Sequence, residues 1–383
     1  MTKTIPYGKQ NINQEDIDAV IQTLQADFLT QGPKIAEFEE KFAHYIGAKY
    51  AIALSNGTAA LHLCALALGV NENSNVITTP ITFVASANCV RYCGGNVYLA
   101  DINPDTFTLD IKKVEDLILS KPKGFFKGII PVDFAGYPVD LEGFRELALK
   151  HNLWIIQDSC HSPGGFFIDK NNNKQNCGNG HFADMAIFSF HPVKHIACGE
   201  GGMITTNNKE LYDKLLFLRT HGITKNPDLL EKNEGGWYYE MQELGFNYRL
   251  TDFQAALGIT QLNRADIGMN RRKEIASIYD NAFAETPAVI VAPKHEGHAY
   301  HLYVIQTSRR KELYDYLKEH HIYCQVHYIP IHLQPYYRDL GFKKGDFPAS
   351  EKYYEQCLSL PMFPTLTNEE QSFVIQKIKE FFN

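Results

Sequence analysis

The sequence predicts an α/β protein in which a central, mostly parallel seven-stranded sheet is flanked by helices, with a smaller α+β domain at the C-terminal end. Short apolar runs alternate with helical patterns through the first two-thirds of the 383 residues, which is typical of a parallel sheet with crossover helices. Seven of these runs have the length and composition of buried strands, and they predict a sheet that is covered on both faces.

The sheet elements are expected in the following order. Strands are predicted at residues 50–54, 75–79, 97–101, 128–133, 154–157, 185–189 and 202–206. Asp110 and Asp140 are expected to N-cap intervening helices, because an aspartate oxygen accepts the free N–H groups of a first turn. The Asn- and Gly-rich stretch 170–180 indicates an exposed hairpin or loop.

A change of pattern follows Thr251. Thr251 and Gln254 form a capping-box pattern that opens a long helical stretch towards Phe283. A strand at 300–305, a helix at 311–320, a strand at 323–328 and two further helices come next, the last capped by Thr367 and Glu370. We therefore predict a large domain at residues 1–255 and a small domain at residues 256–383.

Composition excludes several classes of function. The formal net charge is −7 and no long basic run is present, so we expect no nucleic-acid partner and no anionic membrane surface. The first ten residues are polar, and the longest apolar stretch, 59–70, is too short to span a bilayer. The eight cysteines lack paired spacing and are expected to be reduced, which predicts a cytoplasmic protein. We expect no metal site among the fifteen histidines, because a strand pattern would put His298 and His301 on opposite faces.

The stretch Ser189-Phe190-His191-Pro192-Val193-Lys194 is the most informative motif. An apolar strand ends there, a tight turn presents one lysine, and Gly199-Glu200-Gly201-Gly202 leads away. Asp158 closes another apolar strand, and Gly57 and Thr58 join a strand to a helix. Because ligands of such sheets bind beyond the carboxyl ends of the strands, these residues are expected to share one site.

A lysine, an aspartate and a phosphate cradle are the protein groups that pyridoxal 5′-phosphate (PLP) requires. Lys194 would join its amine to the cofactor aldehyde and later carry protons, and Asp158 would pair with the pyridine nitrogen. Further cofactor contacts are expected from the α-helix N-terminus at Gly57 and Thr58 and from residues nearby. Those residues are Ser189 as a phosphate donor, Phe83 stacked on the ring, and His161 against the ring or its hydroxyl.

Each residue also has a plainer interpretation. Lys194 alone reads as one exposed loop lysine among many, and Asp158 as a structural ion pair or an N-cap. The turn at Gly57 and Thr58 alone is an ordinary strand-to-helix turn, and Phe83 alone is a core residue. It is their combination that favours PLP.

Taken together, the motifs resemble the sugar aminotransferase family that includes the DegT, DnrJ, EryC and StrS groups, of PLP fold type I. The resemblance covers nearly the whole chain and implies L-glutamate as amino donor and a homodimer with shared active sites, in which Asn247 reaches the cofactor phosphate of the partner subunit. The motifs that carry it are Leu29-Thr30-Gln31-Gly32-Pro33, Ser55–Leu61, Asp158-Ser159-Cys160-His161, the Lys194 motif and Gly245-Phe246-Asn247-Tyr248-Arg249-Leu250.

Within the family, the Lys194 motif and the stretch 327–337 look most like the PseC type. Those enzymes aminate C4 of a UDP-linked 4-keto-6-deoxy-N-acetylhexosamine for pseudaminic acid synthesis. The chain departs from that type in having His195 where proline is usual and Ala197-Cys198 where hydroxyl residues are usual. By resemblance of position, the substrate contacts are expected to be Tyr7, Thr30, Arg249, His327 and Tyr328.

Three alternatives stay open at this point. The same chemistry could act on a GDP- or dTDP-linked 4-keto-6-deoxy sugar, since a few hydrogen-bond donors decide such a choice. The related sugar 3-dehydratases replace the lysine with histidine, so the presence of Lys194 argues against them. A non-catalytic homologue would not need Lys194, Asp158, Thr58 and Asn247 together.

Overall fold

A seven-stranded sheet forms the centre of the molecule, as the sequence predicts. The structure, a computed structural model, describes residues 4–286, 288–291 and 294–383. The strand order is β1-β9-β8-β5-β4-β2-β3, in which β9 runs antiparallel to both of its neighbours and the other pairings are parallel. The strands are β1 (Tyr50–Leu54), β2 (Asn75–Thr78), β3 (Asn96–Leu99), β4 (Phe126–Ile130), β5 (Trp154–Asp158), β8 (Met185–Ser189) and β9 (Gly202–Thr206).

Helices cover both faces of this sheet, because successive strand residues point to opposite sides. Ile156 packs in one apolar cluster with α3 (Gly57–Ala67), α4 (Ala85–Tyr92) and α7 (Lys209–Arg219). Ile155 packs on the other face with α5 (Ile111–Leu119) and α6 (Leu141–His151). The predicted caps are confirmed, since the Asp110 and Asp140 side chains accept N–H groups of α5 and α6.

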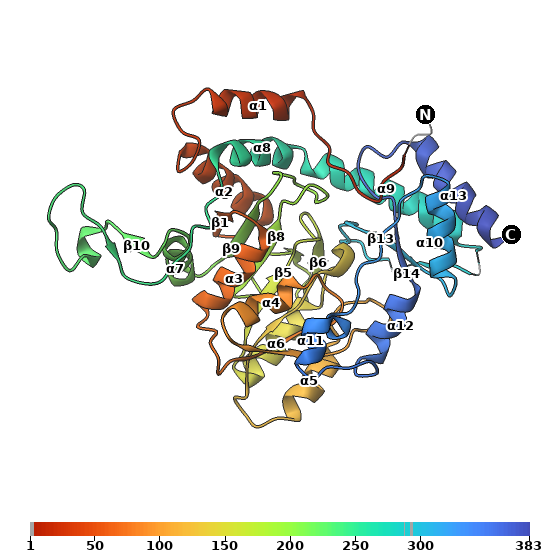
Figure 1. Ribbon diagram of the computed structural model, residues 1–383, viewed down its shortest axis with the longest axis horizontal. Coiled ribbons are helices and arrows are strands. Elements are labelled where there is room, and N and C mark those ends of the chain that lie inside the picture. Colours follow the sequence, from red (N-terminus) through yellow and green to blue (C-terminus); the bar gives the residue numbers. More distant parts are fainter. Residues whose placement is uncertain (1–3, 287, 292–293) are drawn as a thin grey trace.

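Two more helices pack beside the β1–β9–β8 edge. Phe38 and Phe42 of α2 (Pro33–Ile46) and Ile259 of α8 (Asp252–Asn263) share a cluster with Phe188 of β8. Helix α1 (Gln14–Leu24) lies along α8 (Figure 1) and is held there by Asp16, which accepts hydrogen bonds from Thr260, Gln261 and Arg264.

The expected long helix after Thr251 is divided at Arg264. Helix α8 ends at Asn263 and α9 (Ala265–Phe283) begins at Ala265, with the non-helical Arg264 (φ −117°, ψ 15°) between them. At the start of α8 the N–H and hydroxyl of Thr251 both donate to Oε1 of Gln254, which confirms that this pair caps the helix.

The C-terminal part is a three-stranded antiparallel sheet with helices. Its strand order is β12 (Ile290–Val291), β13 (Tyr303–Gln306) and β14 (Cys357–Leu360). The predicted strand at 323–328 is wrong: this segment is extended but makes only an isolated bridge between Gln325 and Ser359. The strand that fills this place, β14, was not expected. The helices are α10 (Arg310–Glu319), α11 (Pro335–Asp339), α12 (Pro348–Gln356) and α13 (Asn368–Phe382).

The N-terminal residues pack against this C-terminal part rather than against the large sheet. Ile5 bridges Ile322 and lies in the same apolar cluster as Leu313 and Leu358. The division into two domains at residue 255 stays a prediction. Thr367 caps α13 as expected. Its side chain accepts the Glu370 N–H, and the Glu370 carboxylate accepts the Thr367 N–H.

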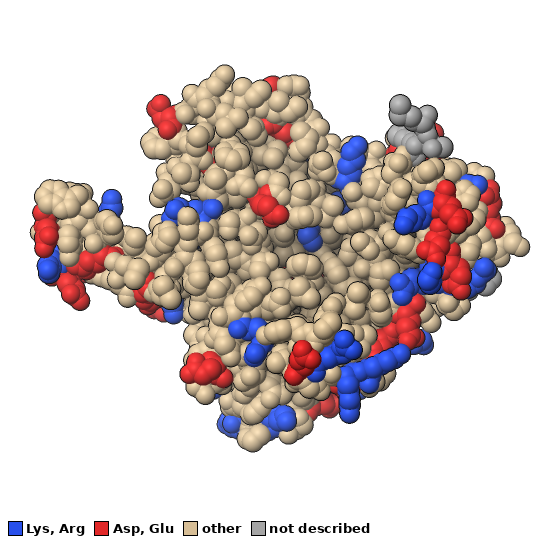
Figure 2. Space-filling view, in the orientation of Figure 1, with Lys and Arg blue, Asp and Glu red and all other residues tan. Residues whose placement is uncertain are grey.

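Two hairpins and short 3-10 helices complete the fold. Residues 170–180 carry most of a hairpin between β6 (Phe166–Ile168) and β7 (Lys174–Asn176), so the predicted hairpin or loop is confirmed. A second hairpin, β10 (Ile223–Thr224) and β11 (Glu240–Met241), projects far from the body of the molecule (Figure 1). On the face shown in Figure 2, acidic and basic side chains are interspersed over the C-terminal helices. Short 3-10 helices lie at Phe134–Gly136, Pro227–Leu229 and Ile331–Leu333.

Candidate active site

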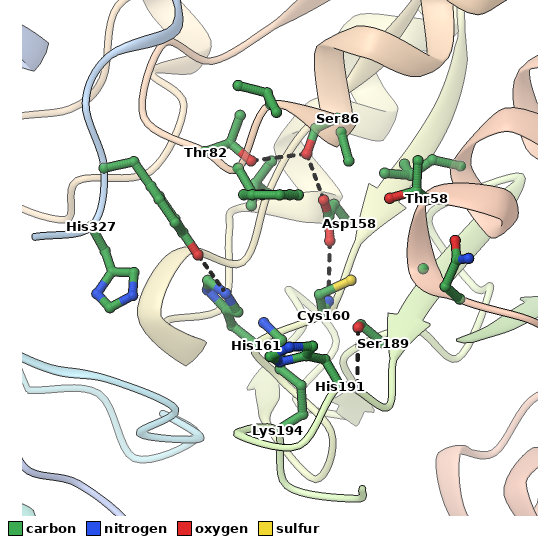
Figure 3. Close-up of a pocket in the computed structure, with 18 of the residues that line it drawn as sticks. Thr58, Thr82, Ser86, Asp158, Cys160, His161, Ser189, His191, Lys194 and His327 are labelled. Atoms are coloured by element: carbon green, nitrogen blue, oxygen red, sulfur yellow. Dashed lines mark hydrogen bonds between the residues drawn. The ribbon is translucent and has the colours of Figure 1, made fainter. Parts of the chain in front are cut away.

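A cavity of about 920 Å³ opens beyond the carboxyl ends of β5 and β8. It has walls from both parts of the chain, because residues from the sheet and residues 325–329 line it. The close-up in Figure 3 shows Lys194, Asp158, His161 and Thr58 around this space. The predicted residues that line it are Tyr7, Gly57, Thr58, Phe83, Asp158, His161, Ser189, Lys194, His327 and Tyr328.

Lys194 is presented by the turn that follows β8. Its backbone N–H donates to the carbonyl of His191 at 2.9 Å, which closes the turn. Its Nζ lies 3.4 Å from Nε2 of His301, a residue more than a hundred positions away. Burial lowers the pKa of the Lys194 amine, with the charge of Arg272 acting in the same direction and Cys160 and Asp158 opposing. A lysine with a lowered pKa is a better nucleophile near neutral pH.

Asp158 is the last residue of β5 and is buried. Ser86 donates to its Oδ2 at 2.6 Å, and the N–H of Cys160 donates to its Oδ1 at 3.1 Å. Two donors fix the plane of the carboxylate, while both oxygens keep a lone pair for another donor. A buried carboxylate at a pocket wall is suited to a cationic partner such as a pyridinium nitrogen.

The candidate phosphate cradle is the N-terminus of α3. Asn56 caps this helix by accepting the Ala59 N–H at 2.8 Å, and the first-turn N–H groups of Gly57 and Thr58 stand at the pocket wall. A Cβ on Gly57 would lie 3.0 Å from Cβ of Ser189, so a side chain there would fill the cradle. Gly202 of β9 lies against the same turn, where a Cβ would meet backbone atoms of Asn56 at 2.5 Å.

His161 and Tyr328 form a linked pair. Nδ1 of His161 accepts the backbone N–H of Ala135 at 3.2 Å, and its Nε2 lies 3.3 Å from the Tyr328 hydroxyl. Because a backbone N–H only donates, the proton of the neutral imidazole is on Nε2, facing Tyr328. Burial, followed by the charge of Lys194, holds the pKa of His161 well below its usual range. Phe83 stands at the mouth of the pocket, 58% exposed.

Three predicted residues lie outside this pocket in their own chain. Thr30 is exposed and bridges Thr251, and Asn247 is exposed and bridges Thr220. Arg249 is half-buried and bridges Leu54. The predicted substrate contacts of Thr30 and Arg249, and the predicted cofactor contact of Asn247, are therefore not made within one chain.

The structure adds three residues that the motifs did not reveal. Ser86 contacts Asp158, His301 contacts Lys194, and Arg272 is buried behind them. Ser86 lies in the first turn of α4 and contacts Asp158 of a different strand, so no local pattern pointed to it. His301 and Arg272 come from the C-terminal part, and only the packing of the two parts brings them to Lys194.

These groups fit PLP. The pocket combines an amine of lowered pKa, an oriented buried carboxylate and a helix N-terminus, which match an aldehyde, a ring nitrogen and a phosphate. Within the described ranges, no cluster of three metal-ligating side chains is found. No helix of those ranges is both long and apolar enough to cross a membrane.

Comparison with known proteins gives the same result. The model of the DegT/DnrJ/EryC1/StrS aminotransferase family matches residues 10–379. The chain is 37% identical over 377 residues to UDP-4-amino-4,6-dideoxy-N-acetyl-beta-L-altrosamine transaminase of Campylobacter jejuni, covering 97% of this chain and 95% of the relative.

Two solved structures have the same fold. Helicobacter pylori PseC, an aminotransferase of pseudaminic acid biosynthesis, superposes with a TM-score of 0.89 at 32% identity, covering 99% of both chains. The PLP form of Spr1654 from Streptococcus pneumoniae superposes with a TM-score of 0.89 at 28% identity, also covering 99% of both.

Proposed function

Because the chain belongs to the DegT/DnrJ/EryC1/StrS aminotransferase family and is therefore a PLP-dependent sugar aminotransferase, we propose that it transfers the amino group of L-glutamate to C4 of a UDP-linked 4-keto-6-deoxy-N-acetylhexosamine. The observation that carries this proposal is the meeting of Lys194, Asp158 and the α3 N-terminus at one pocket. The product would be of the UDP-4-amino-4,6-dideoxy-N-acetyl-L-altrosamine type, in the pseudaminic acid pathway.

The residues have distinct roles in this chemistry. PLP, when bound, supplies an aldehyde that takes up the amino group and a ring that stores the electrons of the broken C–H bond. Nζ of Lys194 would hold the cofactor covalently and, when free, would carry a proton between the substrate carbon and the cofactor. Asp158 stabilises positive charge on the ring nitrogen, and Ser86 orients that carboxylate. The N–H groups of Gly57 and Thr58 bind the phosphate.

The residues at which the chain departs from the PseC type, His195, Ala197 and Cys198, do not line the cavity. His195 donates from Nε2 to the carbonyl of Ala299 at 2.9 Å, and Ala197 and Cys198 are buried. Of the described residues around the cavity, these three are not part of its wall. Residues 325–329, which include His327 and Tyr328 of the stretch that resembles the PseC type, form part of the wall on the C-terminal side.

A shared active site in a homodimer is part of the proposal. The substrates bring several negative charges, namely a cofactor phosphate, a nucleotide diphosphate and the carboxylates of glutamate. Among the described residues that line the pocket, Lys194 is the only lysine or arginine. A second subunit would supply the missing polar and cationic groups, and Asn247 and Arg249 stand on the surface where this is expected.

We also propose that the enzyme acts in the cytoplasm. All eight cysteines are unpaired. Unpaired thiols support a reducing compartment.

The proposal is tested with purified protein, PLP and L-glutamate offered UDP-, GDP- and dTDP-linked 4-keto-6-deoxy sugars, with mass spectrometry of the products. Conversion of the UDP-N-acetyl sugar alone supports it. Conversion of a GDP or dTDP sugar instead would keep the mechanism and overturn the substrate. Formation of no amine by a protein that holds PLP would overturn the proposed function.

A further inference from the structure

A group of basic side chains surrounds Lys194 on the side away from Asp158. The ring of His301 lies 4.4 Å from that of His161 and 5.6 Å from that of His195, measured between centroids. Nζ of Lys194 lies 3.4 Å from Nε2 of His301, while Nδ1 of His301 is buried and has no hydrogen-bond partner among the described residues. Among the described residues, the His301 imidazole is the hydrogen-bond partner of the Lys194 amine.

Arg272 of α9 places a guanidinium behind this group. Its side chain is 1% exposed, and its Nη1 donates to the backbone carbonyls of Tyr300, His301 and Met362 at 3.3, 3.2 and 3.0 Å. In the described part of the chain, no carboxylate forms an ion pair with it. Its Nε is buried and has no hydrogen-bond partner among the described residues, so backbone carbonyls bonded to Nη1 alone hold this cation, which is unusual. The hydrogen bonds of Arg272 fix the backbone at His301. Its positive charge acts on Lys194, His195 and His301.

The backbone conformation before His301 directs that side chain towards Lys194. Tyr300 has φ +47°, a left-handed conformation that an aromatic residue adopts only when its surroundings enforce it. Nδ1 of His298 accepts the Tyr300 N–H at 2.9 Å, and the two rings stack at 4.0 Å. Together with the Arg272 bonds, these contacts offset the strain and orient His301 into the pocket wall.

We infer that His301 is a positioning residue that holds the Lys194 amine as a free base at the pocket wall, through a hydrogen bond from its Nε2–H to Nζ. The partnerless Nδ1 supports this tautomer, because a proton there would be a buried donor without an acceptor, which is costlier than a partnerless lone pair. Burial holds the pKa of His301 well below its usual range, so its imidazole is neutral. Because a protonated ring nitrogen can only donate, the Nζ that accepts this hydrogen bond is an unprotonated amine.

The inference rests on the proposed role of Lys194 in binding PLP. Joining the amine to the aldehyde forms a C=N bond and breaks the C=O bond. Both hydrogens of the neutral amine leave with the aldehyde oxygen as one water, so an ammonium group cannot react until it has lost a proton. A residue that keeps Nζ neutral and in place accelerates this step. It has no part in binding pyridoxamine 5′-phosphate, which has no aldehyde.

The test compares two measurements on cofactor-free, full-length protein. The first is the rate at which added PLP forms the covalent chromophore, and the second is the equilibrium affinity for pyridoxamine 5′-phosphate. His301→Phe keeps a ring against His161 but removes the nitrogen, and we expect capture of PLP to slow about tenfold, the effect of one lost hydrogen bond. His301→Gln places an amide near the Nε2 position and should restore capture, whereas the shorter His301→Asn should not.

The controls separate this inference from the proposed function. Lys194→Ala must abolish capture; if it captures PLP at the parental rate, the proposed function itself fails. His332→Gln changes a buried histidine that pairs with Glu351 outside the pocket wall, and capture should be unchanged. Parental capture by His301→Phe, or equal capture by the Gln and Asn variants, would overturn the inference. So would a loss of pyridoxamine 5′-phosphate affinity equal to the loss in capture rate, since that indicates a structural role.

Discussion

The contact between Ser86 and Asp158 gives a prediction whose size follows from the structure. Both side chains are buried, and the hydroxyl donates to the carboxylate at 2.6 Å, which is typical of a charge-assisted hydrogen bond. Ser86→Ala removes the donor and leaves a buried charged oxygen unpaired. A hydrogen bond to a charged group contributes about 1.5–3 kcal/mol, so we expect the free energy of unfolding of the cofactor-free protein to fall by about 2 kcal/mol.

The chain offers a local probe for this measurement. Of its two tryptophans, Trp154 lies in β5, the strand that ends in Asp158, whereas Trp237 is 74% exposed in the projecting hairpin. In a Trp237→Phe background, urea unfolding followed by fluorescence reports on the large sheet alone. Ser120→Ala is the matched control, since that hydroxyl bonds an exposed helix end and its loss should change the midpoint little.

A double-mutant cycle with Asp158→Asn isolates the interaction with the charge. The cost of Ser86→Ala should fall by at least about 1 kcal/mol when residue 158 carries no charge, because the unpaired group is then a neutral amide. The reasoning is refuted if Ser86→Ala lowers stability no more than Ser120→Ala does, or if its cost is the same in both backgrounds.

Three further outcomes are expected. Gly202→Ala should weaken pyridoxamine 5′-phosphate binding at least about tenfold in equilibrium titration, because the new Cβ would displace backbone of the α3 N-terminus. Gly236→Ala is the control and should leave the affinity unchanged, because a Cβ there has no atom within 4 Å. Equal affinities of the two variants would contradict the assigned cradle. Burial lowers the pKa of His327 to about 3, so the stability that this residue contributes is present above the unfolded pKa and is lost as pH falls from about 6.5 towards 3. His327→Asn should therefore lose less stability than the parent between pH 6 and pH 4 in urea unfolding, by up to about 1.4 kcal/mol per pH unit, and identical losses would be contrary to this. A heterodimer of Lys194→Ala and Asn247→Ala chains has one intact composite site and should show about half the parental activity, whereas an inactive heterodimer would argue against shared sites.

The large sheet was predictable because its seven strands are short apolar runs whose residues are buried on both faces. Ile155 and Ile156 illustrate this, since each packs against different helices. The strand order, and the reversed direction of β9, come from pairings between distant segments that the local pattern does not contain. In the C-terminal part, the pattern at 323–328 predicted a strand, but residues 325–328 of this segment line the pocket. The partner of β13 on this side is β14, which was not predicted.

The site was predictable where a single segment carries both the residue and its backbone setting. Lys194, Asp158 and Thr58 each follow a strand end, and strand ends of a parallel sheet meet at one edge. Ser86, His301 and Arg272 have no such local sign, because each acts on a residue from another segment. Asn247 and Arg249 do not line the pocket of their own chain, so their predicted contacts stay predictions.

The most direct test of the central claim follows the amino group itself. L-glutamate labelled with ¹⁵N is incubated with the enzyme, PLP and the UDP-linked 4-keto-6-deoxy-N-acetylhexosamine, and the product is examined by mass spectrometry and NMR. We predict that ¹⁵N appears at C4 of the sugar, and that Lys194→Ala gives no labelled product. Labelled amine formed at an unchanged rate by Lys194→Ala, or unlabelled sugar recovered with the parental enzyme, would contradict it.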